Sequence, residues 1–74
     1  MRPDDLRALL RRQPFQPLRL HLTNGTLFEI RHPDMASVGR STMTLSLPPE
    51  HGVEREAVIA LLHIIWVENI VPVA

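Results

Sequence analysis

Large apolar residues alternate with polar ones along residues 18–22 and again along residues 26–30, which is typical of two half-buried β-strands. The stretch LHLTNGTLFEI joins them through a glycine turn. A two-residue turn on Asn24-Gly25 would mix apolar and polar residues on each face. A three-residue loop, with Gly25 left-handed in a bulge, instead pairs Leu20 with Phe28 and places the apolar residues on one face. We therefore predict this register, in which Leu22 lies opposite Thr26, Leu18 opposite Ile30, Arg19 opposite Glu29 and His21 opposite Leu27.

The first twelve residues have the pattern of a short amphipathic helix. Pro3 stands where helices begin, and Asp4 and Asp5 suit the positive N-terminal end of the helix dipole. Leucines at positions 6, 9 and 10 form a narrow apolar stripe. Two prolines, at positions 14 and 17, end the helix and predict an extended connector. Such a helix is marginal in water by itself, so its leucines must dock on the rest of the chain.

The second half of the chain predicts further strands. Residues 41–47, STMTLSL, alternate again, and the two prolines that follow are expected to end that strand. The charged stretch PPEHGVERE is expected to be an exposed loop. Residues 54–66 mix helix-favouring and strand-favouring residues, so both structures stay open; we favour a strand to Leu62, a change of direction near His63, and a strand over residues 64–70. Because both faces there are apolar, this region is either a central strand or a seam between molecules.

Size and composition indicate how such a chain can be stabilised. A chain of 74 residues buries only about 60% of its unfolded surface, so a monomeric core is marginal. There is no cysteine and hence no disulfide or thiolate metal site to support it. Self-association is the remaining route, and we expect one domain over residues 1–74 that forms a homo-oligomer.

The order of elements, with the glycine turn LTNGT and a last pair of strands around LLHIIWVENI, resembles the plan of Sm-like small β-barrels. Separately, residues 11–40 resemble a small bacterial protein family without an assigned function. The Sm-like resemblance implies a barrel, but the nucleotide-binding residues of that family map onto no position of this chain. We predict an α+β fold: a short N-terminal helix packed on a strongly bent antiparallel sheet of four to five strands, for which a small Sm-like barrel is one form.

The segment EIRHPDMASVGRST gathers His32, Asp34, Ser37 and Arg40 in one apparent loop. Backbone geometry accounts for Pro33, Asp34 and Gly39, and neighbours in sequence do not by themselves form a catalytic triad. His32 and Arg40 are left without a structural reason. The four histidines lack the short spacing of a zinc site. We therefore expect no catalytic residue, no metal and no cofactor.

Two surfaces are candidates for binding a partner. Arg7, Arg11, Arg12 and Arg19 could form a phosphate-binding patch, although the chain has eight basic and eight acidic residues and no net charge. The apolar residues around the single tryptophan, Ile65, Trp66, Val67 and Ile70, belong to the core or, if the last strand lies at a sheet edge, to a self-association seam.

These patterns predict a non-catalytic interaction module that self-associates. The alternative is an RNA- or DNA-binding regulator that uses the arginine-bearing helix. No secretory signal follows the N-terminus, and the longest apolar run, residues 57–67, is shorter than the roughly 20 residues of a membrane span. We therefore expect a cytoplasmic protein with no membrane association.

Overall fold

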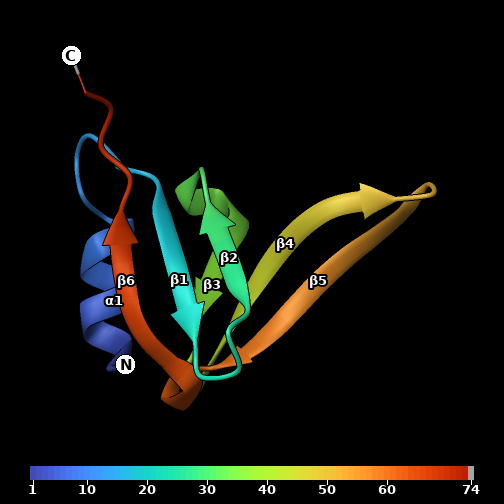
Figure 1. The fold of residues 1–74 in the computed structure, drawn as a ribbon, viewed down its shortest axis with the longest axis horizontal. Coiled ribbons are helices and arrows are strands. Elements are labelled where there is room, and N and C mark those ends of the chain that lie inside the picture. The colour runs from blue at the N-terminus through green and yellow to red at the C-terminus, as the bar shows by residue number, and fades with distance from the viewer. Residues whose placement is uncertain (74) are drawn as a thin grey trace.

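The computed structural model describes residues 1–73 and has one short α-helix and two three-stranded antiparallel sheets (Figure 1). The order in the chain is α1 (Pro3–Leu10), β1 (Leu18–Leu22), β2 (Leu27–Ile30), a 3-10 turn η1 (Pro33–Met35), β3 (Ala36–Val38), β4 (Thr42–Glu50), β5 (Val53–Ala60), a second 3-10 turn η2 (Leu61–His63) and β6 (Ile64–Asn69). The strand orders are β2-β1-β6 and β3-β4-β5. The α+β class is confirmed, whereas the expectation of one sheet with four to five strands is wrong. Within residues 1–73 the strands form no single closed sheet.

The register of the first hairpin is the predicted one. Leu18 pairs with Ile30, Leu20 with Phe28, Arg19 with Glu29 and His21 with Leu27. Gly25 has φ 84°, its N–H donates to the Leu22 carbonyl at 3.0 Å, and the Leu22 N–H donates to the Thr26 carbonyl at 3.0 Å. The three-residue loop therefore places the apolar residues of both strands on the core face.

The C-terminal segment is strand on both sides of a short turn, which resolves the choice between helix and strand. β5 ends at Ala60, η2 changes the direction, and β6 pairs antiparallel with β1. The pairing moves from Leu22↔Ile64 to His21↔Trp66, which leaves Ile65 as the extra residue of a β-bulge. The bulge reverses the alternation, so Ile64 points into the core while Trp66 lies on the outer face with His21.

The β4–β5 hairpin corrects two expectations. β4 continues through Pro48 and Pro49 to Glu50, and the stretch expected to be a loop is mostly strand. The prolines fit because the register shifts between Leu47 and Glu50, so no regular ladder bond requires their missing N–H groups. His51 and Gly52 form the turn with φ 52° and 75°, and this pair of positive φ values is typical of the primed turns of tight hairpins.

The segment expected to be a loop over residues 32–40 contains structure of its own. η1 covers Pro33–Met35, and β3 pairs with β4 through Ala36↔Leu45, Ser37↔Thr44 and Val38↔Met43. Three residues are too few for a recognisable alternation, which is why the sequence did not predict this strand.

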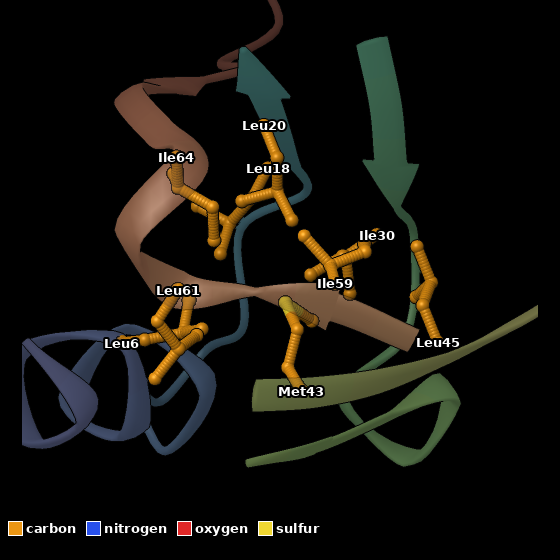
Figure 2. Packing of buried hydrophobic residues seen from close by; sticks show 9 residues of the cluster. All are labelled: Leu6, Leu18, Leu20, Ile30, Met43, Leu45, Ile59, Leu61 and Ile64. Carbon is orange, nitrogen blue, oxygen red and sulfur yellow. The ribbon is translucent and has the colours of Figure 1, made fainter. Parts of the chain in front are cut away.

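The core lies between the two sheets and the helix. Figure 2 shows its nine buried residues, which come from every long element: Leu6, Leu18, Leu20, Ile30, Met43, Leu45, Ile59, Leu61 and Ile64. Leu6 is the one fully buried residue of α1, and Figure 2 places it beside Leu61. The N-terminal ammonium donates to the Leu61 carbonyl at 2.8 Å, which holds the start of the helix near the turn that leads into β6.

Candidate functional site

The predicted seam lies on β6, which is an edge strand of its sheet. Ile65 is 61% exposed and Trp66 is 51% exposed, whereas Val67 and Ile70 are half-buried. Ile70 follows the end of β6 and donates its N–H to the Pro17 carbonyl at 2.9 Å. The sequence left open whether these residues belong to the core or to a seam. The exposed fractions place Ile65 and Trp66 outside the core. Val67 packs partly against the core.

Trp66 is held in place by an aromatic neighbour. Its ring stacks on His21 with 3.7 Å between the ring centroids and 9° between the planes. His21 Nε2 lies 3.0 Å from Glu68 Oε1, and the His21 side chain is only 18% exposed. The contacts of His21 with Trp66 and Glu68 were not predicted, because the bulge that places these two residues beside it has no clear sequence signal.

An ion-pair network continues across the same face of the β2-β1-β6 sheet. Arg19 NH2 lies 2.8 Å from Glu29 Oε1, as the predicted register requires, and Arg19 NH1 lies 3.3 Å from Glu68 Oε1. Arg31 NH2 lies 2.7 Å from Glu29 Oε2. The face therefore has an apolar and aromatic row, Leu27, His21 and Trp66, beside a charged row, Glu29, Arg19 and Glu68.

The network shifts the ionisation of its members. The hydrogen bond with His21 and the charge of Arg19 lower the pKa of Glu68, and the hydrogen bonds and charges of Arg19 and Arg31 lower the pKa of Glu29. The hydrogen bond to Glu29 and the charge of Glu68 raise the pKa of Arg19. Both carboxylates and the guanidinium are therefore held in their charged forms, which orients them as fixed surface charges.

The four candidate arginines do not form a common patch. Arg7 donates to the carbonyls of Val38 and Gly39 and to Asp4, and Arg19 belongs to the network above. Arg12 donates to Gln16 at 2.7 Å and to Asn69 at 3.3 Å. Arg11 is exposed and forms no hydrogen bond through its side chain within residues 1–73. Three of the four guanidinium groups are thus already held by groups of the protein itself.

His32 and Arg40, the two loop residues left without a structural reason by the sequence, differ in the structure. His32 caps η1, because its Nδ1 accepts the Asp34 N–H at 3.2 Å, so it has a structural reason. Asp34 is the residue whose backbone N–H is capped. Arg40 is exposed and takes part in no ion pair in the described part of the chain.

Two hollows lie at the strand edges. An open groove of about 520 Å³ separates the β1–β2 turn from β5 and is lined by Leu22, Phe28, Ala57 and Ile59 among others. A smaller hollow of about 350 Å³ lies between the start of α1 and β6, with Arg2 and Asp5 on one side and residues 64–67 on the other. Among the residues that the structure describes, no three His, Cys, Asp or Glu side chains gather as metal ligands would.

Comparisons with family models, with curated proteins and with solved structures find no match to this chain. Within residues 1–73, no helix combines the length and the apolar character needed to cross a membrane.

Proposed function

We propose that this chain is a non-catalytic interaction module that self-associates through the edge of β6. The observation that carries the proposal is the exposure of Ile65 and Trp66 on an edge strand. Exposed apolar side chains beside unpaired backbone N–H and C=O groups favour association with another chain. A fixed aromatic ring is also well suited to an interface, because little side-chain entropy is lost when a partner covers it.

The small core gives a second reason for an assembly. Nine residues form it, and the described chain exposes 5315 Å². A standard interface buries about 800 Å² of each partner, roughly 15% of that surface. Covering the β6 edge would therefore add substantially to the apolar area that this chain removes from water.

The alternative function, RNA or DNA binding by the arginine-bearing helix, has weaker support. Arg7, Arg12 and Arg19 are bonded to protein groups, and Arg11 is the residue of the predicted set whose side chain has no such bond within residues 1–73. Loss of salt-dependent binding in an Arg11→Ala variant would favour this alternative.

The finer description of the fold, a small Sm-like barrel, belongs to the same proposal. The N-terminal helix, the turn at Gly25 and the turn Leu61–His63 between the last two strands support it. Two separate sheets argue against a barrel closed within one chain.

The test compares association of the wild type with that of Trp66→Ala over a dilution series. Sedimentation measures the mass, and the single tryptophan reports burial through its emission wavelength. If Trp66 is an interface anchor, its truncation weakens association by about 30-fold or more, the effect of a hot spot of about 2 kcal/mol. Leu27→Ala is the matched control, because Leu27 is 52% exposed on the opposite edge strand. A wild type that stays at 8.4 kDa at micromolar concentration contradicts the proposal.

A further inference from the structure

The end of the β4–β5 hairpin, residues 46–56, projects from the rest of the molecule as an arm (Figure 1). Every residue from position 48 to position 56 is exposed. The arm is nevertheless paired, through Ser46↔Glu56, Leu47↔Arg55 and Glu50↔Val53. An isolated two-stranded hairpin is at best marginally stable in water, so a paired arm without a core of its own needs a second surface.

The two edges of the arm differ in what they can accept. β3 pairs with β4 only opposite Met43–Leu45, so both edges of the arm lack a strand neighbour. Neighbouring N–H groups of a strand point to opposite edges, so one of the two consecutive prolines, Pro48 and Pro49, removes a donor from the free edge of β4 and interrupts regular pairing there. The β5 side has no proline over residues 53–60 and offers its full set of alternating N–H and C=O groups. An added strand is therefore expected on β5.

Two acidic residues of the arm lie on one face of β5. Glu54 and Glu56 are two residues apart on β5, so they share one face of the strand. Neither takes part in an ion pair within residues 1–73. Arg55 points to the other face and is bonded to Pro48 and Glu50. The next residue on the acidic face is Val58, which is 70% exposed.

Two arginines border the other free edge. Arg2 lines the hollow at the start of β6 together with Asp5, and the bond from Arg12 to Asn69 places the end of the helix beside the end of β6. Arg2 and Arg11 are exposed and form no ion pair in the described part of the chain. Arginines therefore flank the β6 edge, whose exposed apolar residues, Ile65 and Trp66, match the exposed valine of β5.

We infer that the arm of one copy docks on the β6 edge of a second copy, with β5 added as a strand and with Glu54 and Glu56 facing Arg2 and Arg11, which flank the two ends of α1. This inference rests on the proposed self-association. It identifies β5 of the arm as the surface that binds the β6 edge. Figure 1 places β6 and the tip of the arm at opposite ends of the longest axis, so the contact joins different copies. Because the two surfaces differ, the contact is heterologous and builds a closed ring or an open chain.

Charge reversal on each side tests the pairing. One variant is Glu54→Arg with Glu56→Arg, and the other is Arg2→Glu with Arg11→Glu. Each variant alone sets like charges against each other and should associate roughly tenfold or more weakly than the wild type. In an equimolar mixture the two variants can alternate so that each arm meets an opposite charge, and the mixture should associate more strongly than either variant alone. Arg40→Glu is the control, because this exposed arginine lies in the connection between β3 and β4.

The outcomes separate the two proposals. A wild type that assembles while both charge variants assemble equally well overturns the docking of the arm and leaves self-association through β6 in place. Variants that stay folded by circular dichroism, are monomeric alone and stay monomeric when mixed also overturn it. A monomeric wild type overturns both proposals. An absorbance ratio at 260 and 280 nm that shows nucleic acid in the wild-type assembly, or a mass that requires a different protein, identifies another occupant and contradicts the inference.

Discussion

The β1–β2 hairpin and the arm at the end of the β4–β5 hairpin have the same construction and opposite surroundings. Both are antiparallel, and both turn through a glycine with positive φ, Gly25 and Gly52. The first hairpin contributes Leu18, Leu20 and Ile30 to the core, whereas the arm is exposed from residue 48 to residue 56, and only the base of its hairpin reaches the core, through Met43, Leu45 and Ile59. Pairing alone thus does not decide how firmly a hairpin is held. Burial stabilises the first hairpin within its own molecule, and the arm can obtain the same support only from a partner.

The largest difference between the hairpins is expected for apolar truncation. Leu20→Ala removes a fully buried side chain and should lower the free energy of unfolding by about 2–5 kcal/mol. Val53→Ala, at a site that is 61% exposed, should change it by less than about 0.5 kcal/mol. Urea denaturation, at a concentration where the protein is monomeric, measures both. If both substitutions lowered the free energy of unfolding by the same amount, the arm would be packed as firmly as the core.

A smaller difference is expected for the two turn glycines. An added Cβ meets no atom within 4 Å at Gly25 or at Gly52, so alanine affects each only through the positive φ. Gly25→Ala should cost about 1 kcal/mol of global stability, since the first hairpin unfolds with the core. Gly52→Ala should leave the global unfolding midpoint nearly unchanged and disorder only the arm, which proton chemical shifts of residues 46–56 would reveal. A loss of midpoint as large as that of Gly25→Ala would contradict this separation.

The same contrast explains how much of the fold the sequence predicted. The register of β1 and β2 followed from alternation, because one face of that hairpin is buried and its pattern is therefore constrained. The arm was taken for a loop because PPEHGVERE has no apolar face and contains two prolines. No hydrophobic pattern can predict a strand that buries nothing, and the turn residues His51 and Gly52 were the one usable signal.

The candidate site was predicted only in part, for a different reason. The apolar run from Ile64 to Val67 marked the seam, but alternation could not tell which residues face outward. The bulge at Ile65 decides this, because it turns Ile64 inward and Trp66 outward. The contacts of Arg7 and Arg12 join the helix to β3 and β6, and pairings over such sequence distances leave no local pattern.

The smallest expected effect concerns the ion pair between Arg19 of the first hairpin and Glu68 of β6, and it is visible through pH. Glu68 has a pKa below its ordinary value of 4.5 in the folded chain, so its contribution is present above that pH and is lost as the pH falls through the folded pKa. The melting temperature of the wild type should exceed that of Glu68→Gln near neutral pH, and the gap should shrink below pH 4.5. Glu54→Gln, on the arm, is the matched control and should show no gap in the monomer. A difference in melting temperature between the wild type and Glu68→Gln that does not change with pH would contradict a stabilising role for the Glu68 charge.

Hydrogen exchange of the backbone amides at low and high protein concentration tests the central claim most directly, because it reports on the strand edges themselves. If a second copy covers them, peptides from Val53–Ala60 and Ile64–Asn69 should exchange more slowly at high concentration, while peptides from β1 and β2 should exchange at the same rate at both. Equal exchange of β5 and β6 at both concentrations, in a protein that sedimentation shows to be assembled at the higher one, would contradict it.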